Sequence, residues 1–538
     1  MERRPVERVR GTQDCWPHDA RQLDAIRRRL EATFESFGYR RIEVPVLEPT
    51  ELHLRKSGLE IISKLYAFED QAGRHLCLRP ELTASIVRAY VAQPAPRLPL
   101  KVFSSGPVFR YERPSKGRYR QFTHADAELI GAAGPLADAE IIVLATRALQ
   151  AAGVSHYTVT IGHVGILADL LARLGLTGRL RSFLLESLED VRRHGLASVR
   201  ARLQELDPEL FERADAAAAL GSDATDEGQV RAAIAGFFSE LGTEALGRRS
   251  EADVVERMLR KRFAAGANAR AVERAFGFIE RLGALHGGPE AVLQDGRALL
   301  AEYGLDDAPL QQLARTVELL VDLGVDPARV HLDLGLSRGL QYYTGMVFEI
   351  HHAGLGSESQ LCGGGRYDDL VRALGGRQSV PALGFAFGVE RVKLALEAEA
   401  KTLAVPPAPF VFVVAASPTQ SAAAGRAALA FREAGVAADL EVSRRPLRAS
   451  LAYADKEGFP YVAIVGELEA RDGTVRLREM AGGEERVLPL ADAAAWLMAQ
   501  PILHPEAGRA APAIQHQVPP AAARTPALRP AAGGTHGA

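Results

Sequence analysis

The stretch Val108-Phe-Arg-Tyr-Glu-Arg-Pro-Ser-Lys-Gly-Arg-Tyr-Arg-Gln-Phe-Thr-His-Ala-Asp-Ala-Glu128 is apolar toward both ends and strongly cationic in the middle. An apolar run leads into Arg110 and Glu112, and the apolar pattern returns toward Glu128. Between them lie a proline, a glycine and four cations: Arg113, Lys116, Arg118 and Arg120. Guanidinium groups bind phosphates through paired hydrogen bonds. The stretch therefore predicts a strand–loop–strand that holds a polyphosphate and admits a nucleic-acid end. A solvated charged hairpin is the alternative.

Four further motifs lie elsewhere in the chain. They are Leu78-Arg-Pro-Glu-Leu-Thr-Ala84, Ser337-Arg-Gly-Leu-Gln-Tyr-Tyr-Thr-Gly-Met-Val-Phe-Glu349, Cys362-Gly-Gly-Gly-Arg-Tyr-Asp-Asp369 and Gly384-Phe-Ala-Phe-Gly-Val-Glu-Arg391. In this order, and together with the first stretch, they resemble the motifs of the histidyl-tRNA synthetases, a family of the class II architecture. The resemblance runs from about Arg10 to about Leu497 and leaves out the long middle of the chain.

The composition is that of a globular protein. The 538 residues are 47% hydrophobic and 25% charged, ordinary values for a chain that buries a large core. This length allows roughly three or four domains. The formal net charge is -2, so any RNA contact has to come from local patches such as Arg113–Arg120 rather than from bulk charge.

The cysteines and the first residues of the chain indicate the cellular compartment. Cys15, Cys77 and Cys362 form no C-x-x-C pair, which disfavours a disulfide framework and a thiolate zinc site and fits a reducing compartment. The opening Met-Glu-Arg-Arg-Pro has no apolar signal segment, and no apolar run approaches membrane-spanning length. We expect a cytoplasmic protein with no membrane partner.

The hydrophobic pattern predicts an α+β fold with a mostly antiparallel sheet and flanking helices. Apolar residues recur at helical spacing from Arg21 to Phe37, and Tyr39–Leu47 follows as a strand that Pro45 interrupts. In class II synthetases such a helix and strand form the dimer interface, so the resemblance implies a homodimer. A surface helix that leads into an edge strand is the other interpretation.

Changes in composition divide the chain into four regions. Residues 1–163 and 331–400 carry strand patterns and are predicted to form the class II catalytic core. Residues 164–330 are rich in Ala, Leu, Arg and Glu at helical spacing and predict a helical insertion. Residues 408–498 show a βαβαβ pattern, which predicts an α/β domain that resembles the anticodon-binding domain of these synthetases. The Ala/Pro-rich residues 499–538 are predicted to be a disordered tail.

For ATP, the resemblance implies three catalytic arginines. Attack of a carboxylate on the α-phosphate builds negative charge there, which fixed cations stabilise. Arg110 matches the arginine that binds the α-phosphate, and Arg391 matches the one that binds the γ-phosphate. Arg338 would steady the reacting carboxylate and the α-phosphate. The other implied contacts, with the adenine and the bent phosphates, are Glu112, Arg113 and Phe122. For Arg391 alone, an ordinary helix cation is the alternative.

For the amino acid, the site must offer hydrogen-bonding partners that fit a neutral imidazole. The resemblance implies that Glu128 accepts from the ring while Tyr342 and Tyr343 frame it. It also implies that Glu81 and Thr83 bind the α-ammonium. A tyrosine pair of this kind is otherwise often a plain element of a hydrophobic core.

Four positions depart from the family pattern. A glutamine that contacts the bound amino acid is usual where His124 stands, and a glycine is usual where Asp126 stands. Gln341 replaces an acidic residue. Ser115 stands where a glutamine often meets the extra 5′ guanylate of the tRNA. A second carboxylate at Asp126 would favour a protonated substrate or pair with an arginine, and the sequence leaves both open.

The motifs together imply a histidine–tRNA ligase that depends on ATP and Mg²⁺ and acts on L-histidine and tRNA(His). No dedicated carboxylate site for a metal is evident, so Mg²⁺ follows from the phosphate chemistry and the resemblance. The alternative is a non-catalytic, histidine-sensing paralogue that resembles the regulatory subunit of ATP phosphoribosyltransferase. That subunit lacks the carboxyl-terminal α/β domain and has no use for Arg110, Arg338 and Arg391. The Arg338-Gly-Leu-Gln-Tyr-Tyr343 block disfavours a synthetase for another amino acid.

Overall fold

The computed structural model describes residues 5–57, 63–94, 96–207, 270–336, 342–403 and 410–501. The chain forms two compact units, which divide after Leu403. Three parts of the predictions lie outside the described residues: Arg338 with Gln341, residues 208–269 of the insertion, and the tail beyond residue 501. Across the described ranges, every helix is too short or too polar to span a bilayer.

A nine-stranded sheet forms the centre of the first unit. Its order is β1 (Arg40–Arg41), β5 (Leu100–Phe109), β6 (Gln121–Ile130), β12 (Ala382–Gly388), β11 (Gln360–Arg366), β10 (Met346–His351), β7 (Thr158–His163), β9 (Val330–Asp333) and β8 (His286–Gly287). Neighbouring strands are antiparallel except in the pairs β1–β5 and β7–β9. The predicted α+β fold with a mostly antiparallel sheet is therefore confirmed.

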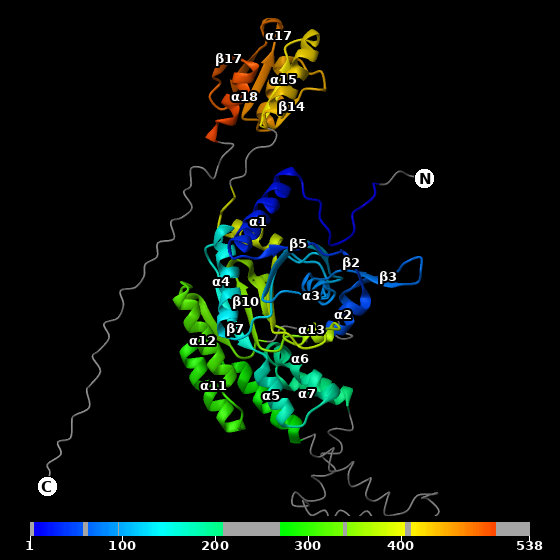
Figure 1. Cartoon of the computed structure of the whole chain (residues 1–538), viewed down its shortest axis with the longest axis vertical. Coiled ribbons are helices and arrows are strands. Elements are labelled where there is room, and N and C mark those ends of the chain that lie inside the picture. The colour runs from blue at the N-terminus through cyan, green and yellow to red at the C-terminus, as the bar shows by residue number, and fades with distance from the viewer. Residues whose placement is uncertain are drawn as a thin grey trace, which may run out of the picture. The chain divides into compact units, whose positions relative to one another are not determined.

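One face of this sheet packs against α1 (Pro17–Ser36), α4 (Pro135–Ala151) and α14 (Val389–Ala398). In α1 the apolar residues Ile26, Leu30 and Phe34 follow one another at four-residue spacing and are fully buried. The ring of Phe34 lies 5.6 Å from that of Phe103 on β5 and 5.7 Å from that of Phe385 on β12. Figure 1 shows α12 (Ala308–Asp322) and α11 (Pro289–Tyr303) beside α4, where they extend this helical layer.

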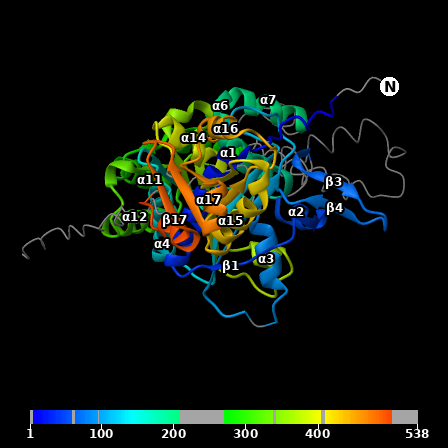
Figure 2. The same cartoon turned by 90° about the horizontal axis from the view of Figure 1, so that it is seen from above.

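The opposite face of the sheet carries α2 (Thr50–Ser57), α3 (Thr83–Val91) and the short helix α13 (Leu370–Ala373). A small antiparallel sheet adjoins α2, with the strand order β2 (Leu47–Pro49), β4 (His75–Leu78), β3 (Tyr66–Glu69). Figure 2 shows α2, β3 and β4 together on one side of the unit. Of the predicted histidine contacts, Thr83 lies in α3 on this face and Glu81 lies just before α3.

The described part of the predicted insertion is helical with one exception. It contains α5 (Gly165–Arg173), α6 (Gly178–His194), α7 (Leu196–Leu206) and a helix over residues 270–284, followed by α11 and α12. His286–Gly287, however, forms β8 and pairs with β9 at the edge of the main sheet. The expectation of helices throughout 164–330 was wrong here, because a two-residue strand has no periodicity of its own. The limits of the insertion stay a prediction.

The second unit contains a five-stranded sheet in the order β14 (Ala438–Leu440), β13 (Val411–Ala415), β15 (Tyr461–Val465), β16 (Thr474–Glu479), β17 (Glu485–Pro489). Its helices are α15 (Ser421–Glu433), α16 (Leu447–Lys456), α17 (Glu467–Asp472) and α18 (Leu490–Met498). Strands β13, β14 and β15 are parallel, as the βαβαβ pattern predicted. A hydrophobic core that includes Phe410, Phe431 and Leu497 holds these layers together.

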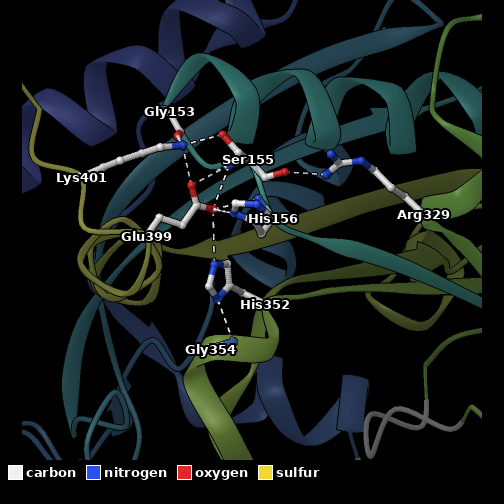
Figure 3. A network of polar contacts seen from close by, with 8 residues as sticks. All are labelled: Gly153, Ser155, His156, Arg329, His352, Gly354, Glu399 and Lys401. Atoms are coloured by element: carbon white, nitrogen blue, oxygen red, sulfur yellow. Dashed lines mark hydrogen bonds and ion pairs between the residues drawn. The ribbon is translucent and has the colours of Figure 1, made fainter.

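Glu399, immediately after α14, ties together three segments of the first unit (Figure 3). Its carboxylate accepts hydrogen bonds from the backbone N–H groups of Ser155 and His156 at 2.8–3.0 Å, and from the ammonium of Lys401 at 2.5 Å. Nε2 of the buried His352 lies 3.3 Å away. Burial alone would raise the pKa of Glu399, but Lys401 and the two N–H groups outweigh it and lower the pKa to about 2.

Replacing Glu399 with alanine is expected to lower the free energy of unfolding by about 2–4 kcal/mol, because two backbone N–H groups and Lys401 would lose a charged acceptor and the buried His352 would lose its partner. Glu397→Ala is the control, since the ion pair of Glu397 with Lys393 is largely exposed and such pairs contribute under about 1 kcal/mol. Urea unfolding followed by circular dichroism measures both variants. Equal losses would contradict the anchoring role of Glu399.

Candidate active site

Strand β6 places ionisable side chains on the face of the sheet opposite the hydrophobic core. Ala125 and Ala127 belong to the core, whereas His124, Asp126 and Glu128 alternate with them and point to the other face. Asp126 and Glu128 are completely buried. Buried ionisable groups are costly without partners, so two carboxyl groups and an imidazole on a central strand mark a candidate functional site.

Strand β12 makes room for Glu128 by carrying a glycine opposite it. Gly384 is the residue paired with Glu128 across the two strands. A Cβ atom at Gly384 would lie 1.6 Å from Oε2 of Glu128 and 2.5 Å from its carboxyl carbon. On the next strand, a Cβ atom at Gly365 would lie 3.0 Å from Cδ1 of Tyr343. The glycine-rich motifs of β11 and β12 therefore leave space for the side chains of the site.

Glu128 has one carboxyl oxygen engaged and one without a partner. Oε2 accepts a hydrogen bond from the hydroxyl of Tyr367. Among the described residues, no group forms a hydrogen bond with Oε1, although this atom is buried. Burial raises the pKa of Glu128 well above its usual range, while the hydroxyl groups of Thr83 and Tyr367 act in the opposite direction. Oε1 is thus a buried polar atom that a bound ligand can satisfy.

Glu81, just before α3, is a second buried carboxyl group of the site. Oε1 accepts a hydrogen bond from the N–H of Ala84 at 2.9 Å, and Oε2 forms an ion pair with the ammonium of Lys56. Burial would raise the pKa of Glu81, but the positive charge of Lys56 and the hydrogen bonds from Lys56 and the N–H of Ala84 outweigh it and lower the pKa to about 2. Glu81 is therefore an ionised carboxylate, suited to an ammonium ligand.

Tyr342 and Tyr343 lie together beside Glu128. Their ring centroids are 4.4 Å apart, and the hydroxyl of Tyr342 donates to that of Tyr343 at 3.2 Å. Tyr367, which binds Glu128, meets the Tyr342 ring edge-on at 5.8 Å. The ammonium of Lys56 lies 3.9 Å from the centroid of Tyr342. The predicted histidine contacts Glu81, Thr83, Glu128, Tyr342 and Tyr343 are thus brought together.

Arg110 lies at the end of β5, beside Phe122 on β6. Its Nε donates to the carbonyl oxygen of Pro80 at 3.0 Å, and its guanidinium carbon lies 5.3 Å from the centroid of Phe122. The ring of Phe122 meets that of His124 edge-on at 5.2 Å. Two predicted ATP contacts and one predicted histidine contact are therefore neighbours.

The other predicted ATP residues have different surroundings. Nε of Arg391, in α14, donates to the carbonyl oxygen of Gly117 at 3.0 Å, and Nη1 donates to that of Gln360 at 2.9 Å. Burial would raise the pKa of Glu112, but its ion pair with Arg118 and the charge of Arg110 lower it. Arg113 is exposed on the loop between β5 and β6.

His124 lies near both the predicted histidine contacts and the predicted ATP contacts. Burial lowers its pKa well below the usual range, and the positive charges of Arg110 and Arg391 lower it further. Both guanidiniums therefore lie close enough to act on one imidazole. Nδ1 of His124 is 3.2 Å from Oδ1 of Asp126, and burial raises the pKa of Asp126 well above its usual range. Asp126 thus contacts a histidine, a partner that neither sequence-based alternative included.

A sequence model described as histidyl-tRNA synthetase matches residues 11–236 and 216–392 of the chain. The chain belongs to the histidyl-tRNA synthetase family. A model described as an anticodon binding domain matches residues 410–500, which lie within the second unit. The first unit thus corresponds to the synthetase model and the second to the anticodon-binding model.

Two curated relatives of this synthetase are named histidine–tRNA ligase. The protein of Archaeoglobus fulgidus is 34% identical over 485 residues, 90% of this chain and 97% of its own. That of Thermococcus kodakarensis is 32% identical over 488 residues, 89% of this chain and 95% of its own.

Solved structures share the fold of this synthetase. The histidyl-tRNA synthetase of Nostoc sp. PCC 7120 has a TM-score of 0.62 at 20% identity and covers 92% of this chain and 99% of its own. A Bacillus halodurans protein titled ATP phosphoribosyltransferase regulatory subunit/histidyl-tRNA synthetase has a TM-score of 0.59 at 23% identity and covers 86% and 99%. The fold alone therefore does not distinguish a histidyl-tRNA synthetase from an ATP phosphoribosyltransferase regulatory subunit.

In this synthetase three side chains of the site were missed from the sequence. Lys56 and His53 lie three residues apart in α2, on one helical face, and both are buried. The sequence signal for these two residues was the three-residue spacing of two ionisable side chains shortly before the motif that contains Glu81. Tyr367 was part of a quoted motif, but nothing local indicated its hydrogen bond with Glu128, 239 residues away.

Proposed function

We propose that this synthetase activates L-histidine with ATP and transfers the histidyl group to tRNA(His). In the first step a carboxylate oxygen of histidine attacks the α-phosphorus of ATP. An O–P bond forms, the bond to the pyrophosphate leaving group breaks, and histidyl-adenylate remains. In the second step a terminal hydroxyl of the tRNA attacks the acyl carbon and AMP leaves. The membership in this family and the full-length similarity to ligases support the proposal.

The observation that supports the amino-acid side best is the unsatisfied Oε1 of Glu128, which among the described groups lacks a hydrogen-bond partner although it is buried. An imidazole N–H satisfies such an acceptor, and a site built this way discriminates against side chains that cannot donate, by roughly 10⁴-fold. Glu81 is ionised and able to accept the α-ammonium. Tyr342 and Tyr343 supply flat apolar surface beside both carboxyl groups.

The phosphate side relies on fixed cations. Arg110 is held by Pro80 and Phe122, and Arg391 by two backbone carbonyls, so neither has to reorganise when charge develops on phosphorus. Arg338, outside the described residues, completes the proposed set. Mg²⁺ would accompany ATP through the phosphate oxygens, where it would neutralise charge.

Several further features belong to the proposal. The second unit would bind the anticodon of tRNA(His), in line with its match to the anticodon binding domain. The protein would act in the cytoplasm as a homodimer, with residues 1–163 and 331–400 as catalytic core and 164–330 as an insertion. The histidine-sensing paralogue is disfavoured, because the relatives that match the chain over nearly all of their length are ligases.

Pyrophosphate exchange tested with each of the twenty amino acids decides between the two functions. We expect exchange with histidine only, because its imidazole N–H and α-ammonium fit the two buried carboxyl groups, whereas the larger indole is the only other aromatic ring with an N–H donor. Histidine binding without exchange for any amino acid would support the sensing paralogue and contradict the ligase. Exchange with a different amino acid would contradict both.

A further inference from the structure

Lys56 is a buried cation that none of the sequence motifs includes. Its side chain is 2% exposed, and its ammonium forms an ion pair with Glu81. The same ammonium lies 3.9 Å from the ring centroid of Tyr342. Lys56 therefore touches both the carboxylate proposed for the α-ammonium of histidine and a tyrosine proposed to frame the imidazole.

Burial of a charged lysine is energetically unfavourable unless a partner compensates its charge. Burial lowers the pKa of Lys56, whereas the charges of Glu81 and Glu128 raise it. The charged and titratable groups around Glu81 come from two elements: Lys56 and His53 of α2, and His124, Asp126 and Glu128 of β6. Arg110, after β5, acts on Lys56. Among these, Lys56 forms the direct ion pair with Glu81.

We propose that Lys56 is a positioning residue of the histidine site, which keeps the Glu81 carboxylate ionised and oriented for the substrate α-ammonium while its own ammonium supports the Tyr342 ring. The inference rests on the proposed function and extends it to a residue that lies outside the five motifs quoted from the sequence. It gives the buried ion pair a role in substrate affinity in place of a purely structural one.

The electrostatic argument for this role is direct. A buried carboxyl group without a countercharge favours its neutral form. A neutral carboxyl group at Glu81 would lose the charge attraction for an ammonium ligand. The N–H of Ala84 remains as the other donor to Glu81, so the carboxyl group keeps part of its orientation when Lys56 is removed. Loss of Lys56 should therefore mainly affect the charge of Glu81.

The neighbouring His53 is consistent with a site built around this pair. It is 1% exposed, and burial lowers its pKa to about 4. In the described part of the chain its Nε2 has no hydrogen-bond partner. A neutral His53 cannot replace Lys56 as the countercharge of Glu81 near neutral pH. The ionisation of Glu81 therefore depends on Lys56.

The test is equilibrium binding of L-histidine to the full-length protein by calorimetry, without ATP. Lys56→Met is expected to raise the Kd at pH 7 by roughly tenfold or more, as for loss of a charged hydrogen bond. Lys56→Arg should recover part of the affinity. The matched control is Lys101→Met, because Lys101 also pairs with a glutamate, Glu140, and lies 5.3 Å from a tyrosine ring, that of Tyr39.

Two readouts separate this role from a structural one. In Lys56→Met the raised pKa of Glu81 leaves it protonated below that pKa, so the ratio of variant to wild-type Kd should fall as the pH rises from 6 to 8. The titration of histidine itself cancels in this ratio. Imidazole-4-propionate, which lacks the α-ammonium, should bind both proteins equally, whereas a collapsed site would lose both ligands.

The outcomes keep the two proposals distinct. A wild-type protein that does not bind L-histidine would overturn the proposed function itself. If the wild type binds histidine and Lys56→Met binds it equally well at every pH, the role of Lys56 is wrong. Tighter binding by Lys56→Met would also overturn it, because Lys56 would then compete with the substrate ammonium.

Discussion

Histidine-dependent pyrophosphate exchange is expected to fall by roughly 10³-fold when Arg110 is replaced by alanine, the loss typical of a missing transition-state charge donor. The guanidinium of Arg110 is already fixed, because Nε donates to Pro80 and the group lies against Phe122. A cation held in place stabilises the charge that develops on the α-phosphate. The loss should therefore appear in kcat more than in the KM for histidine.

Arg329→Ala is the matched control for Arg110→Ala. Nη1 of Arg329 donates to the carbonyl oxygen of Ser155 at 2.6 Å, and its guanidinium carbon lies 4.6 Å from the ring centroid of Tyr157, so it repeats the surroundings of Arg110 far from the β6 site. Arg110→Lys should be intermediate, since lysine keeps the charge but not the planar pair of donors. A normal kcat for Arg110→Ala, or an equal loss for Arg329→Ala, would contradict the role of Arg110.

The limits of a helix were predictable where apolar residues repeat at helical spacing within one segment of the sequence. The helical pattern predicted from Arg21 to Phe37 falls almost entirely within α1 (Pro17–Ser36), because apolar residues recur there at helical spacing. The short helix α17 was missed. Its stability depends on a hydrogen bond from the N–H of Gly466 to Glu469, and six residues are too few to show a helical period.

The resemblance supplied a set of candidate site residues, but not the contacts that determine their charge states. Glu81, Glu128 and Arg110 lie where the motifs implied, close to one another. The ionisation states of Glu81 and Glu128 depend on pairs that are distant in sequence, such as Lys56 with Glu81, 25 residues apart. The contact of Asp126 with His124 was open to sequence reasoning, since alternate residues of a strand share a face. The burial of this carboxyl group beside an imidazole could not be predicted in the same way, because it depends on the position of β6 within the sheet.

Replacing Gly384 with alanine is expected to raise the Kd for L-histidine by at least roughly 100-fold, in the range expected when a buried group is displaced by overpacking. The new methyl group would lie 1.6 Å from Oε2 of Glu128 and 2.7 Å from the carbonyl oxygen of Ala127. The backbone of β6 is fixed by pairing on both sides, so the Glu128 side chain has to move and lose its hydrogen bond with Tyr367. Calorimetry with histidine measures the loss.

Gly388→Ala on the same strand is the control for Gly384→Ala. A Cβ atom at Gly388 would meet its nearest neighbour, Cδ of Arg391, at 3.7 Å, an ordinary van der Waals distance. Both substitutions add one methyl group to β12, so a difference between them isolates the displacement of Glu128. Histidine binding should survive in Gly388→Ala and fail in Gly384→Ala, with the folded state of both checked by thermal unfolding. Wild-type affinity in Gly384→Ala would mean that the position of Glu128 does not determine histidine binding.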